Sequence, residues 1–260
     1  MIFNKNISQK TLSKTFGINS DREGIITRYL SEKNNWEAHL QNSKQYILDA
    51  SKTKDKNIAV ILGSGWWLDI PYKELSEIFH KLYFIDISHP NQIIHKAKKY
   101  PNIELITADI SGTLKLVYEI KKHKKEFNIN NFNIDVNNFG IPKEIKPDFI
   151  VSLNLLNQLS YFPKHYLLKH EVISKKEVKI IVEKIEQSHL NNLQKNKSCI
   201  IADFYQYEYS FDNILQKEFK RTTVNIPVNS TRKEWIWDFD LSGNFINNKK
   251  IKFKVAALQV

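Results

Sequence analysis

Five short apolar runs, separated by stretches with helical spacing, constrain the fold of this 260-residue chain more than any other feature. A short continuous apolar run is typical of a strand buried on both faces of a parallel sheet. The runs are NIAVIL at 57–62, LYFIDI at 82–87, IELITA at 103–108, DFIVSL at 148–153 and CIIADF at 199–204. Between them, apolar residues recur at helical spacing, as at Leu75, Ile78 and Phe79. The alternation predicts an α/β fold with a doubly wound, mostly parallel sheet.

The pattern changes after residue 205. KRTTVNIPV at 220–228 and IKFKVAAL at 251–258 both have the character of strands, and no helical pattern lies between them. Two successive strands without a crossover helix are expected to pair antiparallel. WIWDF at 235–239 alternates and is a candidate for a further short strand.

The N-terminal part differs in texture from the rest. Residues 1–54 are predicted to form a helical cap or arm ahead of an α/β domain at 55–260. Within that part, 36–50 has apolar residues close to one helical face, which predicts a helix packed on the sheet. Residues 1–20 are polar and are expected to be a mobile arm or a lid, and the Asn-rich segment 127–146 is expected to be a surface loop or insertion.

The charge balance bears on the kind of partner. A net charge of +11 favours nucleic acid or an anionic surface as a partner. Lysine greatly outnumbers arginine, however, and arginine is the better residue for bidentate phosphate and base contacts. A richness in Lys, Asn and Ile together also follows from AT-rich coding. Nucleic acid therefore stays open as a partner without being favoured.

Cysteine usage and hydropathy bear on the compartment. Cys199 is the only cysteine, so an intramolecular disulfide is excluded. No run approaches the roughly 20 apolar residues of a membrane span, and the polar N-terminus lacks the apolar block of a secretory signal. We expect a cytoplasmic protein without a membrane span; the sequence does not indicate its oligomeric state.

A glycine pair follows the first apolar run directly, as Gly63-Ser64-Gly65. In a doubly wound sheet, ligands bind beyond the carboxyl ends of the strands. Glycines at that place let a ligand approach the backbone and allow positive φ. A lone G-x-G is weak evidence, because many tight strand-to-helix turns contain it.

Two acids end the next two predicted strands. Asp86 follows the glycines by about 20 residues, a spacing at which a carboxylate can accept hydrogen bonds from ribose hydroxyls. Asp109 ends the third predicted strand and can accept a hydrogen bond from an exocyclic amine such as that of adenine. Each acid alone could instead cap a helix. Three such positions at the ends of three successive strands favour a ligand site.

This constellation resembles the class I S-adenosylmethionine-dependent methyltransferase superfamily, which has a Rossmann-like fold. ILGSG at 61–65, FIDIS at 84–88 and TADIS at 107–111 are similar to its glycine loop, its ribose-binding acid and its adenine-contacting acid. VSLNLLNQLS at 151–160 is similar to its strand-four segment, which lines the methyl-transfer pocket. The resemblance covers roughly 55–258, and it implies seven strands with an antiparallel C-terminal hairpin.

The resemblance implies S-adenosylmethionine as the cofactor. The sequence has no residue spacing typical of a metal site, so no metal is expected. The positions expected to contact the cofactor are Gly63, Ser64, Gly65, Asp69, Asp86, Ile87, Asp109, Ile110 and Asn154. Asn154 and Asn157 are expected to position the methyl acceptor, with capping of the following helix as the alternative.

The chain departs from the family pattern at two places. The family usually has an acid two residues before the first glycine, where this chain has Ile61, and Asp69 is the candidate to replace its charge. The third glycine is also missing, with Trp67 near its place. Leu68 stands where a dinucleotide fingerprint would have glycine, which argues against a nicotinamide cofactor.

These observations favour a methyltransferase that acts on a small molecule by direct in-line transfer, a reaction for which positioning supplies much of the rate. The departures at Ile61 and Trp67 keep a second hypothesis open, a catalytically silent methyltransferase-like binding module. An RNA methyltransferase, motivated by the basic charge, is the third.

Overall fold

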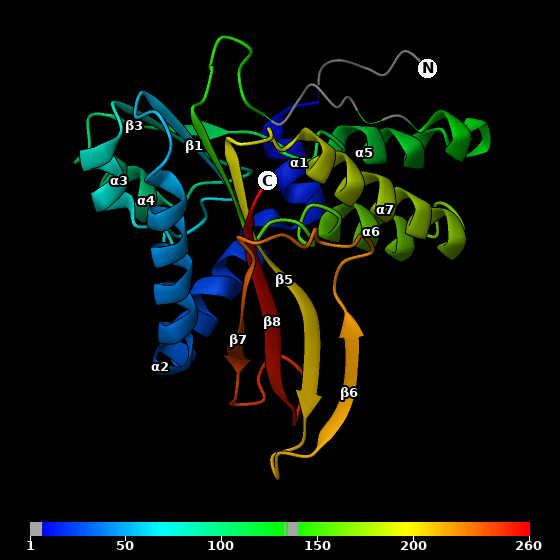
Figure 1. Ribbon diagram of the computed structural model, residues 1–260. Coiled ribbons are helices and arrows are strands. Elements are labelled where there is room, and N and C mark those ends of the chain that lie inside the picture. Colours follow the sequence, from blue (N-terminus) through cyan, green and yellow to red (C-terminus); the bar gives the residue numbers. More distant parts are fainter. Residues whose placement is uncertain (1–6, 133, 135–139) are drawn as a thin grey trace.

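The computed structural model describes residues 7–132, 134 and 140–260, and a single eight-stranded sheet runs through it (Figure 1). Its strand order is β3-β2-β1-β4-β5-β8-β7, and β6 pairs with β5 beside this path. The strands are β1 (Ile58–Leu62), β2 (Lys81–Asp86), β3 (Ile103–Thr107), β4 (Phe149–Leu153), β5 (Ser198–Tyr209), β6 (Leu215–Lys220), β7 (Lys233–Asp240) and β8 (Lys250–Gln259).

The pairing confirms the predicted doubly wound architecture. β1 is parallel to β2 and β4, β2 to β3, and β4 to β5, whereas β8 is antiparallel to both β5 and β7. The five apolar runs are the five strands β1 to β5. β1, β4 and the first half of β5 are buried on both faces, and their sequences are accordingly continuously apolar, whereas in the outer strand β3 only Ile103 is buried.

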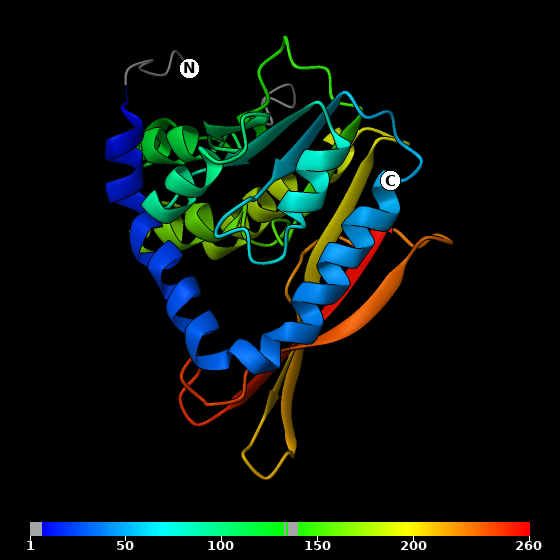
Figure 2. The same cartoon turned by 90° about the vertical axis from the view of Figure 1, so that its left-hand side faces the viewer.

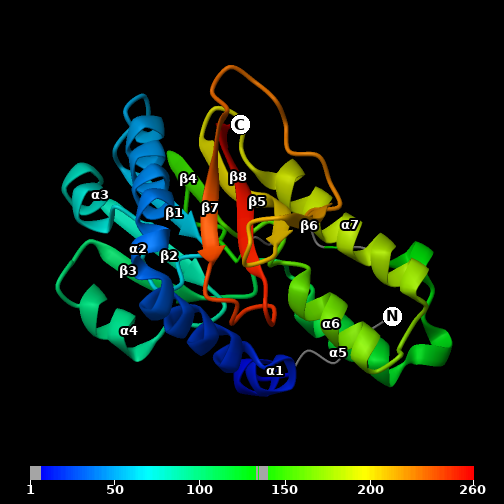
Figure 3. The same cartoon turned by 90° about the horizontal axis from the view of Figure 1, so that it is seen from below.

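Helices cover both faces of the sheet, as the view from below shows (Figure 3). The helices are α1 (Gln9–Phe16), α2 (Ile18–Ser51), α3 (Tyr72–Ile78), α4 (Asn91–Ala97), α5 (Leu114–Lys122), α6 (Tyr161–Lys169) and α7 (Lys175–Asn192), with short 3-10 turns at Lys124–Glu126 and Ile129–Asn131. One apolar core joins α5, α6 and α7 to the sheet, and a second joins α2, α3 and α4 to its other face.

The strand predicted at 220–228 is wrong. β6 ends at Lys220, and the chain from 221 to 228 is irregular, with Val224 and Ile226 buried against the core beside α7. The Glu186 carboxylate of α7 accepts hydrogen bonds from the backbone N–H groups of Thr223 and Val224, so those donors are not free for a ladder. Pro227 has no N–H to give.

The C-terminal hairpin is therefore β7–β8, and β7 contains the alternating segment 235–239. The sheet has eight strands instead of the seven implied by the resemblance, because β6 is additional. β5 is long enough to accommodate it: residues 198–201 pair with β4, and residues 205–209 pair with β6.

The predicted helix at 36–50 forms the second half of α2 and packs on the sheet beside β7. α2 has 34 residues and is bent at Glu32, whose φ of −111° and ψ of 19° are not helical. Figure 2 shows the bend, with one half of α2 following the sheet and the other turning toward α1.

Two segments expected to be irregular are only partly described. Of residues 1–20, the first six lie outside the described residues; residues 9–16 and 18–20 are helical, and Leu12 and Phe16 are buried. Of the loop expected at 127–146, residues 133 and 135–139 lie outside the described residues. Within the described part of the chain, none of the helices has the length and apolar character needed to cross a membrane.

Candidate functional site

A cavity of about 190 Å³ lies at the carboxyl ends of β1, β2, β3 and β4, and α2 contributes the opposite wall. Every position that the resemblance assigns to the cofactor lines this cavity: Gly63, Ser64, Gly65, Asp69, Asp86, Ile87, Asp109, Ile110 and Asn154. Asn157 is not among the lining residues. The doubly wound topology brings these positions together, because parallel strands end at the same edge of the sheet.

The glycine loop is shaped by two positive φ angles, 79° at Gly63 and 46° at Gly65. A Cβ on Gly63 would lie 2.8 Å from the carbonyl oxygen of Leu153, so the loops after β1 and β4 approach each other too closely for any side chain. Glycine is required here for both conformation and space.

Asp86 joins the loops after β1 and β2. Its Oδ2 accepts a hydrogen bond of 2.8 Å from the backbone N–H of Gly65, and its Oδ1 accepts one of 3.2 Å from Ser88 N. Burial raises the pKa of the Asp86 carboxyl, and these backbone donors offset part of that rise. The acid therefore holds the glycine loop in place while it lines the cavity.

Asp109 has the capping role that was its alternative interpretation. Its Oδ2 accepts a hydrogen bond of 2.9 Å from Leu114 N, the first residue of α5, and its Oδ1 accepts from Ser111 N and Ser111 Oγ. The carboxyl also lines the cavity, and burial raises its pKa. Capping and ligand contact are compatible, since each carboxylate oxygen has two lone pairs.

The two tryptophans of the glycine loop lie in different places. Trp67, with φ of 60°, is buried in the core and packs edge-on against Phe84 at 4.6 Å between ring centroids. Trp66 lines the cavity, and its Nε1 donates a 2.9 Å hydrogen bond to the carbonyl oxygen of Arg22 in α2.

Ile61, at the family's acid position, and Asp69, the candidate to replace its charge, lie in different surroundings. Ile61 is completely buried in the core between the sheet and α2, a place unsuited to a carboxylate. Asp69 lines the cavity, and its Oδ2 accepts a 2.8 Å hydrogen bond from Asn154 Nδ2. Burial raises the pKa of Asp69, and the hydrogen bond from Asn154 and the charge of Lys44 offset only part of that rise.

His39 is a cavity residue that the sequence did not single out. Trp235 Nε1 donates a 3.0 Å hydrogen bond to His39 Nδ1, and the imidazole stacks on Trp237 at 3.8 Å between centroids. A protonated imidazole has no acceptor, so this bond requires a neutral ring. Burial lowers the pKa of His39 to about 3, and the ring therefore stays neutral near pH 7.

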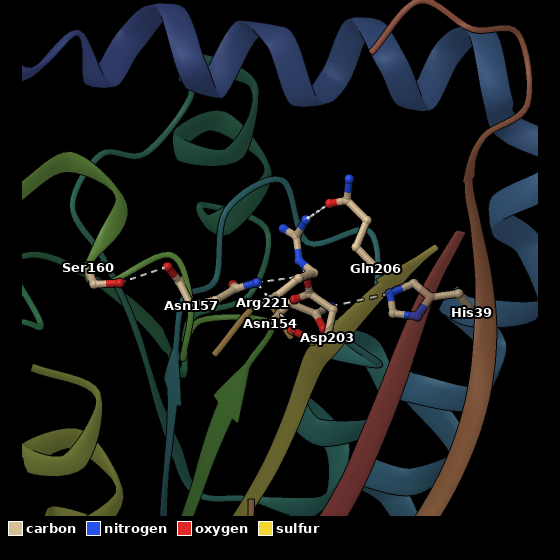
Figure 4. A network of polar contacts seen from close by, with 7 residues as sticks. All are labelled: His39, Asn154, Asn157, Ser160, Asp203, Gln206 and Arg221. Atoms are coloured by element: carbon tan, nitrogen blue, oxygen red, sulfur yellow. Dashed lines mark hydrogen bonds and ion pairs between the residues drawn. The ribbon is translucent and has the colours of Figure 1, made fainter. Parts of the chain in front are cut away.

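Asn154 and Asn157 lie close to different partners (Figure 4). Asn154 has a φ of 46°, and its Nδ2 lies 3.3 Å from His39 Nε2. Asn157 Nδ2 instead donates a 2.9 Å hydrogen bond to Asp203 Oδ2. Asp203 also pairs with Arg221 at 2.6 Å, so Asn157 belongs to a network that fastens the β4 loop to β5.

The first half of α2 closes the cavity from the side opposite the strand ends. Arg22 NH1 donates a 2.7 Å hydrogen bond to Ser88 Oγ in the loop after β2. Together with the bond from Trp66 to the Arg22 carbonyl, this contact fastens the helix to the loops after β1 and β2, two of the loops that carry predicted cofactor positions. We call residues 18–31 of α2 the roof segment.

Among the described residues, no group of three or more His, Cys, Asp or Glu side chains is arranged to hold a metal ion.

No protein-family model and no curated protein matches this sequence. Among solved structures, the chain is similar to the N-methyltransferase NodS from Bradyrhizobium japonicum WM9, with 9% identity, 88% of this chain and 99% of that chain covered, and a TM-score of 0.37. It is also similar to the plantazolicin methyltransferase BpumL in complex with SAH, with 13% identity, coverage of 96% and 95%, and a TM-score of 0.36.

A third solved structure, the 23S rRNA methyltransferase ErmE, has 8% identity, coverage of 85% and 68%, and a TM-score of 0.33. Likenesses this distant carry no argument about activity. The strand order and the antiparallel C-terminal hairpin of the sheet are those of the class I methyltransferase fold, and the chain has that fold.

Proposed function

We propose that the chain is an S-adenosylmethionine-dependent methyltransferase that acts on a small molecule by direct in-line transfer. The observation that carries the proposal is the convergence of the glycine loop, Asp86 and Asp109 on one cavity at the strand ends. Bound there, the cofactor would supply a methyl group on a sulfonium sulfur, and the neutral thioether that departs is a good leaving group.

The residues of the cavity fit such a ligand. Asp86 would hold the ribose hydroxyls, Asp109 the adenine amine, and Asp69 the ammonium of the methionine end. Ser64 Oγ is buried and lines the cavity, and it has no hydrogen-bond partner among the described residues. Buried polar groups are normally satisfied, so this atom favours a polar ligand.

The acids that line the cavity also support a positively charged ligand. Asp69, Asp86 and Asp109 all have pKa values raised by burial, and a nearby positive charge would stabilise their ionised forms. A sulfonium with an ammonium group supplies that charge. The pyrophosphate of a nicotinamide dinucleotide would add negative charge to the same place, which supports the choice of cofactor.

The roof segment supports a small acceptor. It closes the cavity opposite the strand ends, so a polymer such as RNA would reach the cofactor positions only after the contacts of Arg22 to Ser88 and Trp66 are broken. One observation favours the alternative of a silent binding module: the family's acid before the first glycine is replaced by the buried Ile61.

Isothermal titration calorimetry with S-adenosylhomocysteine tests the cofactor assignment. We expect the wild type to bind and Asp86→Asn, which removes the charge but keeps the shape, to bind about tenfold or more weakly. Asp212→Asn, at an exposed position outside the cavity, is the matched control and should bind normally. Absence of wild-type binding at about millimolar ligand would rule out the proposal.

An assay of methyl transfer distinguishes the proposed enzyme from the catalytically silent binding module. Transfer of a labelled methyl group to a small-molecule extract, but not to RNA, is expected of the proposed enzyme. Binding of S-adenosylhomocysteine without transfer to either pool supports the silent module.

A further inference from the structure

We propose that the methyl acceptor is an amine with an apolar body, and that Asp21 of the roof segment is the carboxylate that receives it. This inference rests on the proposed function and adds the substrate class to it.

The charges that line the cavity are opposite in sign to those of the whole chain. The chain carries a net charge of +11, yet the charged side chains lining the cavity are those of Asp21, Asp69, Asp86, Asp109 and Arg22. Asp69, Asp86 and Asp109 are the acids assigned to the cofactor. Arg22 NH1 is hydrogen-bonded to Ser88. Asp21 is the charged side chain that the cofactor leaves without a role.

Asp21 lines the cavity together with several apolar side chains. On the roof segment, Ile18 and Ile25 lie three residues before it and four after it, which places all three on one face of the helix. Apolar side chains of the β4–α6 segment and of α6 also line the cavity, beside the polar Asn154 and Gln158; they are Leu155, Leu159 and Phe162. One carboxylate among apolar side chains suits a ligand with a single positive end.

The Asp21 carboxylate has no fixed partner. Among the described residues, no hydrogen bond to it is found, and no cationic group lies within ion-pair distance. Arg28 attracts it electrostatically from two turns along the helix, but the Arg28 guanidinium lies over the rings of Phe239 and Phe245. Asp21 is exposed to solvent, and desolvation by the surrounding protein raises the pKa of its carboxyl.

A second observation points to a ligand with N–H donors. Asn154 is 8% exposed and lines the cavity, and its Oδ1 has no hydrogen-bond partner among the described residues. A carboxylate or phosphate ligand has only acceptors, so it would leave Asn154 Oδ1 unsatisfied and would be repelled by the surrounding acids. An amine supplies both the donors and the charge.

The chemistry of an amine acceptor gives Asp21 a defined task. An ammonium has no lone pair, so it must first give a proton, which the Asp21 carboxylate accepts. The freed lone pair of the nitrogen forms the new N–C bond while the bond from the methyl carbon to sulfur breaks and leaves its electron pair on sulfur. The methylated ammonium product and the proton on Asp21 then pass to solvent.

Three probes of similar size test the inference by calorimetry on protein saturated with S-adenosylhomocysteine: 2-phenylethylamine, 2-phenylethanol and phenylacetate. We expect the amine to bind roughly tenfold more tightly than phenylacetate, with the alcohol between them. Asp21→Asn should bring the three affinities close together. Glu23→Gln, an exposed acid on another face of the same helix, should keep the amine preference.

The affinity for S-adenosylhomocysteine distinguishes the cofactor assignment from the role of Asp21 in binding the amine. If Asp21→Asn binds it as the wild type does, the cavity is intact and the probe result concerns Asp21 alone. Phenylacetate binding as tightly as the amine, no measurable amine binding, or an unchanged preference in Asp21→Asn overturns the amine assignment while the proposed function stands. Failure of the wild type to bind S-adenosylhomocysteine overturns both.

Discussion

The two halves of α2 meet at Glu32 and are held in opposite ways. From Glu32 onward the helix buries a residue at almost every turn; these are Glu32, Trp36, His39, Ser43, Tyr46, Ile47, Ala50 and Ser51. In the roof segment, only Ile18 is buried, and Leu30 is 68% exposed. The second half of α2, residues 32–51, is therefore tightly packed, and we call it the wall. The roof segment is more loosely held.

The contacts of the two halves differ in kind as well as in number. Trp36 Nε1 and Tyr46 OH donate hydrogen bonds to the carbonyl oxygens of Phe239 and Thr231, and both rings are buried. The roof segment is held by hydrogen bonds of Arg22, each of which contributes about 0.5–1.5 kcal/mol, and by the partly buried Tyr29 and the Arg28 guanidinium, which lies over two phenylalanine rings. The roof can therefore open for a ligand while the wall stays folded.

The largest expected effect concerns the wall. Trp36→Ala removes a side chain that is 2% exposed, its stacking on Phe239 and its hydrogen bond, and we expect unfolding to become easier by about 3–5 kcal/mol. Urea denaturation at pH 7 measures this change. Leu30→Ala, at an exposed position of the roof segment, is the control and should change stability by less than about 0.5 kcal/mol. Equal losses in the two variants would contradict the contrast between the halves.

The joint at Glu32 should give an intermediate effect. Its carboxylate accepts hydrogen bonds from Leu241 N, Ser242 N and Asn35 Nδ2, and Glu32→Gln should cost about 1–3 kcal/mol at pH 7. Burial alone would raise the pKa of Glu32, but these hydrogen bonds outweigh it, and the pKa is lowered.

The pH dependence at Glu32 follows from the sign of that shift. A lowered pKa of an acid stabilises the folded state above the unfolded-state pKa of the group, and this stabilisation is lost as the pH falls through the folded-state pKa. The stability difference between the wild type and Glu32→Gln should therefore be present at pH 7 and shrink as the pH falls below about 4. A difference independent of pH would show that the charge of Glu32 is not what holds the joint.

The smallest effect on overall stability is expected in the roof segment. Arg22→Ala removes the bond to Ser88 and should cost about 1 kcal/mol or less in global stability. Amide hydrogen exchange should nevertheless become several-fold faster in 18–31 and stay unchanged in 36–50, which mass spectrometry resolves. Thr27→Ala, whose hydroxyl contacts only the Glu23 carbonyl within the helix, is the control. Equal acceleration in both halves would mean that they open together.

The wall and the strand ends were predictable from the sequence, because the relevant signals are local. A strand buried on both faces leaves a continuous apolar run, and Asp86 and Asp109 follow such runs directly. The same local logic failed at 220–228, where the side chain of Glu186, far away in sequence, takes the backbone donors that a strand would use.

The roof was not predictable in the same way. Arg22 and Ser88 are 66 residues apart, and nothing in either segment marks them as partners. His39 carries a weak signal, since it lies on the predicted helical face near Trp36, but its neutral state depends on Trp235, which β7 brings to it. Asp21 is an ordinary acid in the sequence, and only the fold places it on a cavity.

The branch at β5 gives the sheet three outer strands, β3, β7 and β6, where an unbranched sheet has two. Each outer strand has one row of backbone N–H and C=O groups without a partner strand, and such rows can pair with another chain. β6, with the sequence LQKEFK, carries Lys217, Glu218 and Lys220 among its six residues. Charged side chains at that density disfavour edge-to-edge pairing of β6 with a strand of another molecule. The additional strand is therefore protected against aggregation in concentrated solution.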